Sequence, residues 1–451
     1  MDTLETNPYL VGNFAPVRDE RDAAALDVTG AIPPELTGLL LRNGPNPVLD
    51  PDPALYHWFL GDGMLHGIEL AGGAARYRNR WVRTTEACVA LGEPPPPDAP
   101  PAVNGIGAKA NTHVVAHAGR IYALVESSLP TEVRPDLSTV GAIDFDGRLT
   151  SAFTAHPKVD AVTGEMHFFG YDFLGEPFLR YHVVDASGAL TRSEEIELPG
   201  PVMMHDFAIT ASSVVWLDLP VVFDVTTVGS RPFPFVWRPD HGARVGIMPR
   251  LGGNADVMWT EIEPCYVFHF LNAWEDDDAI IVDGCRSPRL MANFSDTPLT
   301  ETCPPTLHRW RIDNGRATCE QLDDRTVDFP RTADSVVGRP NRFGYAAEGL
   351  FGPEIANFDR VVKYDLADGS TTRHHYGEHA SSGEAVFAPD PAGTAEDDGW
   401  LLNFSTDLST NTSEFVILDA RDLAAGPVAR IELPRRVPFG FHGNWMAGVI
   451  G

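Results

Sequence analysis

Cysteine is scarce in this sequence, and no cysteine pairing motif is present. The five cysteines are odd in number, and no two of them form a C-x-x-C pair. Disulfide-rich secreted domains and zinc ribbons use even numbers of cysteines or short fixed spacings. The pattern therefore argues against both classes and predicts a protein of the reducing cytoplasm.

Basic residues are also few. The chain has 34 lysines and arginines against 63 aspartates and glutamates, which gives a formal net charge of -29 at pH 7. Binding to a nucleic-acid backbone requires clustered lysines and arginines that displace counterions. We therefore expect no nucleic-acid partner, and we expect anionic lipid to be repelled as well.

The sequence also lacks long apolar segments. The sequence has no run of about 18 apolar residues, the length that a membrane span needs. Its first residues, MDTLETNPYL, contain neither the basic nor the apolar segment of a secretory leader. We expect no membrane-spanning segment, and at most transient membrane contact through a peripheral apolar patch.

Short strand-like runs recur along the whole chain, between 41 glycines and 38 prolines. Few windows keep a helical period for three turns, so the pattern predicts an all-β sandwich, barrel or propeller. A propeller could have six or seven blades, and no WD-type repeat is evident. Because no long linker interrupts the pattern, one domain over residues 1–451 is expected. The runs lie at 38–43, 120–126, 177–184, 213–220, 278–284, 360–366, 400–405 and 414–420.

Four of the 15 histidines have tight polar and aromatic surroundings in the sequence. They are His156 in TAHPKVD, His205 in VMMHDFAIT, His269 in CYVFHFLNAWE and His442 in PFGFHGNW. Their separations far exceed those of local motifs such as H-x-x-x-H, so a shared metal would require them to converge from different blades on the central axis. Neutral imidazole suits zinc, copper, iron and nickel, and the four ligands alone leave the metal open.

Three acidic residues in separate segments are candidate partners of these histidines. A ligating imidazole usually donates its second N–H to a carboxylate or a carbonyl group. Glu126 in ALVESSLP, Asp328 in TVDFPR and Glu384 in SGEAVF could accept such hydrogen bonds. By pattern alone, the same residues could be turn or surface acids.

A set of segments in register over nearly the whole chain resembles one known family. It is the family of the carotenoid cleavage oxygenases, which includes lignostilbene dioxygenases and the retinoid isomerohydrolase. The segments are LLLRNGPNP, YHWFLGDGMLHG, ANTHVV, AHPKVD with TGEM, VMMHDFAIT, VDFPR, EDDGWLL and FGFHGNW.

The resemblance implies a seven-bladed β-propeller with a cap of loops and short helices over its metal-bearing face. It also implies one Fe(II) ion per chain, with O2 as co-substrate. The iron ligands would be the four histidines named above, with Glu126, Asp328 and Glu384 as their hydrogen-bond partners. Asp328 departs from the glutamate that is commoner in this motif. Thr112 matches a threonine whose methyl group lies near an open iron position.

The implied reaction is the cleavage of a carbon–carbon double bond by O2 into two carbonyl products. Activation of O2 requires a redox metal, which favours iron over zinc. Lignostilbene-type members place a lysine directly before the residue that matches Glu126, and this chain has Val125 there. The sequence therefore favours a carotenoid or apocarotenoid over a stilbene or phenylpropenoid such as resveratrol or isoeugenol. Isomerohydrolase chemistry is disfavoured, and a propeller that only serves as a binding scaffold is the alternative from another class.

The substrate is expected to be a small apolar molecule, either a polyene or a stilbene. Apolar burial would bind it in a tunnel at the metal, although ordinary core packing could equally explain the aromatic residues near the ligands. The chain is expected to be a monomer or a weak homodimer. The candidate tunnel residues are Phe59, Val125, Phe270, Phe439 and Phe441.

Overall fold

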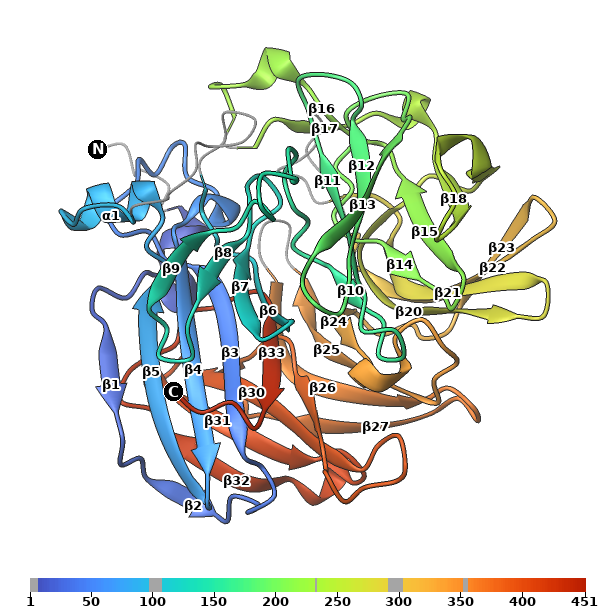
Figure 1. The fold of residues 1–451 in the computed structure, drawn as a ribbon. Coiled ribbons are helices and arrows are strands. Elements are labelled where there is room, and N and C mark those ends of the chain that lie inside the picture. The colour runs from blue at the N-terminus through green and yellow to red at the C-terminus, as the bar shows by residue number, and fades with distance from the viewer. Residues whose placement is uncertain (1–6, 97–107, 232, 291–302, 352–355) are drawn as a thin grey trace, which may run out of the picture.

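The computed structural model describes residues 7–96, 108–231, 233–290, 303–351 and 356–451. Seven antiparallel sheets surround a central axis, and a separate two-stranded hairpin lies outside them (Figure 1). The prediction of a seven-bladed β-propeller is therefore confirmed. All eight strand-like runs of the sequence form strands.

The first three blades contain the N-terminal strands and one strand from the C-terminus. Blade 1 is ordered β1 (Arg21–Ala23), β5 (Ala74–Trp81), β4 (Gly63–Ala71), β3 (Gly38–Pro45) and β33 (Gly443–Ala447). Blade 2 contains β6 (His113–His117), β7 (Arg120–Leu124), β8 (Thr131–Val133) and β9 (Thr139–Ala142). Blade 3 contains β10 (Lys158–Val159), β11 (Met166–Tyr171), β12 (Leu179–Val184) and β13 (Leu190–Ile196).

The remaining blades follow in chain order. Blade 4 contains β14 (Ala208–Ile209), β15 (Ser213–Asp218), β18 (Arg244–Pro249) and β19 (Met258–Glu261). Blade 5 contains β20 (Tyr266–Asp276), β21 (Ala279–Ser287), β22 (Thr306–Asp313) and β23 (Arg316–Gln321). Blade 6 contains β24 (Val327–Arg331), β25 (Phe343–Phe351), β26 (Ala356–Asp365) and β27 (Ser370–His375). Blade 7 contains β28 (Ala380–Ser381), β29 (Val386–Pro389), β30 (Gly399–Asp407), β31 (Thr412–Asp419), β32 (Pro427–Glu432) and β2 (Val28–Gly30).

Both ends of the chain close the ring of blades. The C-terminal strand β33 pairs with β3 in blade 1, where Gly38 lies opposite Ala447. The N-terminal strand β2 pairs with β32 in blade 7, where Val28 lies opposite Ile431. Figure 1 shows the blue N-terminal and red C-terminal strands side by side in these sheets. The ring is thus held by two independent strand pairings between distant parts of the sequence.

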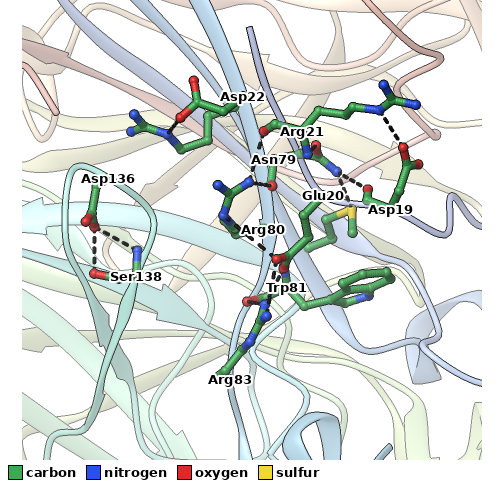
Figure 2. A network of polar contacts seen from close by, with 12 residues as sticks. Asp19, Glu20, Arg21, Asp22, Asn79, Arg80, Trp81, Arg83, Asp136 and Ser138 are labelled. Atoms are coloured by element: carbon green, nitrogen blue, oxygen red, sulfur yellow. Dashed lines mark hydrogen bonds and ion pairs between the residues drawn. The ribbon is translucent and has the colours of Figure 1, made fainter. Parts of the chain in front are cut away.

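An ion-pair network attaches the first strand to the outside of blade 1 (Figure 2). Asp22 of β1 accepts hydrogen bonds from Arg76 at 2.8 Å and from Arg78 at 3.0 Å, both on β5. The hydrogen bond from Arg76 is the main reason that the pKa of Asp22 falls to about 2. Arg83 contacts Glu20 in the same network. These contacts align the edge strand, which lacks buried side chains of its own.

One α-helix, several 3-10 turns and one hairpin accompany the seven blades. The hairpin consists of β16 (Val221–Phe223) and β17 (Phe235–Trp237). Helix α1 (Thr85–Leu91) begins where the Thr84 hydroxyl accepts from the Ala87 N–H, and it ends at Gly92, which is left-handed with φ 72°. No helix of the described chain combines the length and apolarity needed to cross a membrane. The 3-10 turns are Pro8–Leu10, Gly12–Phe14, Trp58–Leu60, Val225–Thr227, Pro239–His241, Asn254–Asp256, Asp334–Val336 and Leu423–Ala425.

Candidate metal centre

Four histidines from four blades meet on the central axis. His156, His205 and His442 lie just before the inner strands β10, β14 and β33, and His269 lies within the inner strand β20. The four possible ligand atoms lie within 4.8 Å of one another. The Nε2 atoms of His156 and His205 are 3.0 Å apart, those of His205 and His269 3.3 Å, and those of His269 and His442 3.1 Å. The predicted convergence of these residues is present in the structure.

The partners of the Nδ1 atoms determine which imidazole lone pairs face the central axis. His269 Nδ1 lies 2.8 Å from Asp328 Oδ1, and His442 Nδ1 lies 3.0 Å from Glu384 Oε1. His205 Nδ1 contacts Glu126 Oε1. A carboxylate at Nδ1 selects the tautomer in which Nδ1 carries the hydrogen, so Nε2 presents a lone pair. The three predicted acids therefore lie where a ligand-orienting carboxylate is needed.

This arrangement fits a metal ion. Lone pairs that face one another at 3.0 to 3.3 Å repel unless a cation lies between them. Imidazole nitrogens that bind one ion at about 2.0 to 2.1 Å lie only about 3 Å or slightly more from their neighbours. The four histidines are thus already spaced as ligands of one ion.

Burial keeps two of the imidazoles neutral, as metal ligands must be. Burial and the neighbouring histidines hold the pKa of His156 and that of His442 well below the ordinary value. Burial acts in the same direction on His205, but the surrounding carboxylates, Glu126 first and then Asp206 and Asp328, together raise the pKa of that histidine. A cation at Nε2 would compete with a proton for the same lone pair.

Asp328 reaches its histidine directly, despite its shorter side chain. The pairing of β24 with β25 shifts register between Asp328 and Arg331, and Phe329 has a left-handed backbone with φ 52°. A left-handed conformation is uncommon for a bulky residue. The irregular strand carries Asp328 to within 2.8 Å of His269, so no bridging water is required.

Thr112, from blade 2, lies beside the four histidines. It is buried and precedes the inner strand β6, and its carbonyl accepts a hydrogen bond from the His442 N–H at 3.1 Å. Its hydroxyl donates to Asn111 Oδ1 at 2.9 Å. With Glu126 from blade 2, Asp328 from blade 6 and Glu384 from blade 7, every blade therefore contributes to the centre or its surroundings.

An aromatic cavity of about 330 Å³ opens beside the histidines. Four of the five predicted tunnel residues line it, namely Phe59, Val125, Phe439 and Phe441. The 3-10 turns near the N-terminus and the β16–β17 hairpin supply further walls, including Tyr9, Phe14, Trp58, Phe223 and Phe235. The segments on this side of the propeller thus form an apolar chamber over the metal centre.

Phe270, the fifth predicted tunnel residue, does not line the aromatic cavity. This residue faces a second cavity beyond the histidines, and Phe268 lines the aromatic cavity in its place. Residues 268 and 270 would share one face of a regular strand, but the pairing of β20 with β21 shifts register between Val267 and Phe270. The β-bulge therefore sends the two rings into different cavities.

Lys109 is a site residue that the sequence reasoning missed. Among the described residues that line the aromatic cavity, it is the single lysine or arginine. Its Nζ donates to Asp62 Oδ1 at 2.7 Å, which leaves two ammonium hydrogens for other acceptors. Its place three residues before Thr112, in the same AKANT segment, was the available signal. Tyr171, whose hydroxyl contacts Glu126, was missed as well.

The fold and the site define a β-propeller protein with a buried four-histidine centre and an apolar chamber above it. The family model described as retinal pigment epithelial membrane protein matches residues 14–447. The chain belongs to this family, that of the carotenoid cleavage oxygenases, and is an oxygenase.

Named relatives and a solved structure agree with this assignment. The chain is 41% identical to a carotenoid cleavage oxygenase of Mycobacterium tuberculosis, with 97% of each chain covered. It is 36% identical to carotenoid 9,10(9',10')-cleavage dioxygenase 1 of Arabidopsis thaliana, over 96% of this chain and 89% of the relative. The crystal structure of Pseudomonas brassicacearum lignostilbene dioxygenase matches with a TM-score of 0.89 and 30% identity, over 98% of both chains.

Proposed function

We propose that this protein is an Fe(II)-dependent dioxygenase that cleaves a carbon–carbon double bond of a carotenoid or apocarotenoid with O2. One Fe(II) ion per chain would be held by His156, His205, His269 and His442. The observation that carries the proposal is the set of converging Nε2 lone pairs at the floor of an aromatic chamber. The products would be two carbonyl compounds, each with one oxygen atom from O2.

The residues of the chain hold the ion, align the substrate and exclude water. When bound, the iron supplies the electrons that activate O2, a role that zinc lacks. Glu126, Asp328 and Glu384 fix the orientation of three imidazoles through their Nδ1 atoms. The aromatic walls bind an extended polyene by apolar burial, worth about 25 cal/mol per Å². Thr112 narrows the cavity beside the histidines, which limits how the double bond can approach.

A stilbene or phenylpropenoid is the second candidate substrate, and Lys109 is the observation that favours it. An ammonium group in an apolar chamber can bind a phenolic oxygen, even though Val125 occupies the position where lignostilbene-type members have a lysine. The lignostilbene dioxygenase of similar structure acts on that substrate class by name. The apolar character of the other walls supports a polyene more strongly.

Product analysis separates these candidates. The protein is purified with Fe(II) and ascorbate and incubated with carotenoids, apocarotenals, resveratrol and isoeugenol under isotopically labelled O2. We expect polyene aldehydes with one labelled oxygen in each fragment. The His205→Ala variant should lose both bound iron and product, whereas His379→Ala, a change at an exposed histidine, should lose neither.

Other outcomes have clear meanings. If phenolic aldehydes are the sole products, a stilbene or phenylpropenoid is the favoured substrate class. A wild-type protein that binds iron fully and consumes no O2 with any substrate would contradict the dioxygenase proposal and favour a binding scaffold.

We also propose that the protein works in the cytoplasm as a monomer or weak homodimer, formed of one domain. The five cysteines are unpaired, as expected in a reducing compartment. The net charge of -29 opposes lasting contact with anionic membranes. Light scattering across protein concentrations tests the oligomeric state, and a stable dimer at the lowest concentration would contradict it.

A further inference from the structure

A second cavity, of about 450 Å³, reaches the four histidines from the side away from the aromatic chamber. We name it the axial cavity, because it follows the inner strands β6, β10, β14, β20 and β24. Its inner end contains His156, His269 and His442, which are buried. Its outer end contains Ala116, Ala161, Asp334 and Ser335, which are exposed. The axial cavity thus connects the metal centre with solvent.

The walls of the two cavities differ in chemistry. Asp206, Asp334 and Glu384 line the axial cavity with carboxylates, and Asn272 and Asn444 line it with amides. The aromatic chamber is lined mainly by aromatic and other apolar side chains, and its two carboxylates, Glu126 and Asp328, are those that contact the histidines. A divalent cation is strongly hydrated and prefers oxygen ligands, so passage along aromatic walls would require it to lose water without replacement.

The cationic side chains of the axial cavity are neutralised by its acids. Lys158 Nζ lies 2.7 Å from Asp206 Oδ1. Arg331 lies 3.4 Å from Glu384 Oε1 and 3.5 Å from Asp334 Oδ1. Three carboxylates against two cations leave one net negative charge on these walls. The side chain of Asp334 is 70% exposed, which places that negative charge at the mouth.

We propose that the axial cavity is the route by which the metal ion reaches the four histidines, so that metal and substrate arrive from opposite sides. This inference rests on the proposed metal site. Hydrated cations are drawn to the acidic mouth and exchange water for protein oxygens on the way inward. The aromatic chamber remains dry and free for the apolar substrate.

The rate of metal binding tests the route without any measurement of catalysis. Metal-free protein is mixed with Co(II), and the visible absorption of the bound ion is followed by stopped flow. Ala116→Trp and Ser335→Trp each place a large ring at the outer end of the axial cavity. Ser127→Trp is the matched control, because it places the same ring in the aromatic chamber.

We expect Ala116→Trp and Ser335→Trp to slow Co(II) binding by about tenfold or more, with the equilibrium Kd unchanged. Because a barrier in the route affects both directions equally, removal of Co(II) by a chelator should slow by the same factor. Ser127→Trp should bind Co(II) at the wild-type rate. The proposal is overturned if both axial variants bind at that rate or if Ser127→Trp is the slow one.

A charge variant tests the mouth independently of any bulky side chain. Asp334→Asn should slow Co(II) binding by about two- to fivefold at low ionic strength, and the difference should vanish at high salt. Glu263→Gln, which removes a 90% exposed carboxylate outside the axial cavity, should have no effect. Equal slowing by both changes would show a general effect of net charge. It would overturn the proposal that the carboxylate at the mouth attracts the metal ion.

Failure of the proposed metal site itself gives a different result. In that case the wild-type protein would bind no Co(II) at equilibrium, whereas failure of the route alone leaves the wild-type affinity intact. Circular dichroism of each variant confirms that the fold is retained, and Asp334→Asn provides the test should both tryptophan variants fail to fold.

Discussion

At the scale of single residues, the centre combines groups that are individually ordinary. An imidazole, a carboxylate and a buried backbone amide occur throughout the protein, and other buried histidines have plain structural partners. His66, for example, contacts the Tyr77 hydroxyl at 2.8 Å, and His182 contacts Ser151 at 2.9 Å. What distinguishes the four axial histidines is that their Nε2 atoms face one another, while three of their Nδ1 atoms face carboxylates.

The first prediction concerns Asp328. Its removal in Asp328→Ala frees His269 Nδ1 and should weaken metal affinity by about 10- to 100-fold. Co(II) titration of the metal-free protein measures this loss. Thr332→Ala, a change at a buried neighbour that is no partner of the axial histidines, serves as control. Unchanged affinity in Asp328→Ala would show that the carboxylate does not orient its histidine.

The second prediction concerns Lys109. In Lys109→Met, substrates with an oxygen on the end group should lose about 10- to 100-fold in kcat/KM, since a hydrogen bond to a charged group contributes about 1.5 to 3 kcal/mol. Substrates with plain hydrocarbon ends should be cleaved at the wild-type rate. Because the change leaves buried Asp62 without its cationic partner, the comparison is repeated in Lys109→Met with Asp62→Asn. Equal losses for both substrate types would indicate a structural role alone.

At the scale of elements, the inner strands place the site and the ion pairs between blades hold those strands. Asp160, which follows β10 and is 1% exposed, lies 2.6 Å from Arg250 and 3.1 Å from Arg339. Arg250 follows β18 of blade 4, and Arg339 lies between β24 and β25 of blade 6. One carboxylate thus connects three blades near the axis.

The third prediction is the cost of breaking this connection. Burial alone would raise the pKa of Asp160, but the Val162 N–H and Arg250 lower it to about 2. A lowered pKa means that the carboxylate stabilises the fold above the ordinary pKa near 4 and that this contribution is lost as the pH falls toward 2. Asp160→Ala should lower the free energy of unfolding by about 3 to 5 kcal/mol at pH 7, because the buried guanidinium of Arg250 and the partly exposed one of Arg339 lose their carboxylate partner.

Denaturant unfolding at pH 7 and at lower pH measures this effect. Asp22→Asn, in the half-exposed network of Figure 2, is the matched control and should lower the free energy of unfolding by less than about 1 kcal/mol. An Asp160 variant no less stable than the Asp22 variant would contradict the prediction.

At the scale of the whole molecule, the pairings of β2 with β32 and of β3 with β33 join the seven blades into one closed ring. Strand β33 begins directly after His442 and pairs with β3 in blade 1. Closure of the ring therefore also positions a proposed metal ligand. Gly38 of β3 faces this strand so closely that an added Cβ would lie 2.4 Å from the Met446 carbonyl oxygen. Closure therefore depends on the absence of a side chain at residue 38.

The fourth prediction follows from this close approach. Gly38→Ala should force β3 and β33 apart and lower the free energy of unfolding by about 1 to 3 kcal/mol. If the chain is one domain, as we propose, calorimetry should still show a single transition, shifted to lower temperature. Gly119→Ala, at a turn where an added Cβ meets no atom within 4 Å, controls for the loss of a glycine in a left-handed position. Two separate transitions would contradict the single-domain proposal.

Much of the fold could be predicted from local pattern. The eight strand-like runs form strands because alternation and turn residues act over a few neighbours, which the sequence displays directly. Periodicity left the number of blades at six or seven, and only the family resemblance indicated seven. Local context singled out the four histidines and three acids as candidates, but only the resemblance implied that they share one metal site, since their separation in the chain conceals their contact.

The amino-acid sequence by itself determined the all-β class, the acidic surface and the residue types of the centre. Only the tertiary structure decided which acid serves which histidine, that a bulge turns Phe270 away from the aromatic chamber, and that Lys109 points into it. These properties depend on contacts between residues far apart in the chain and on small register shifts. Side-chain direction reverses with a shift of one residue, and no local pattern records where such a shift occurs.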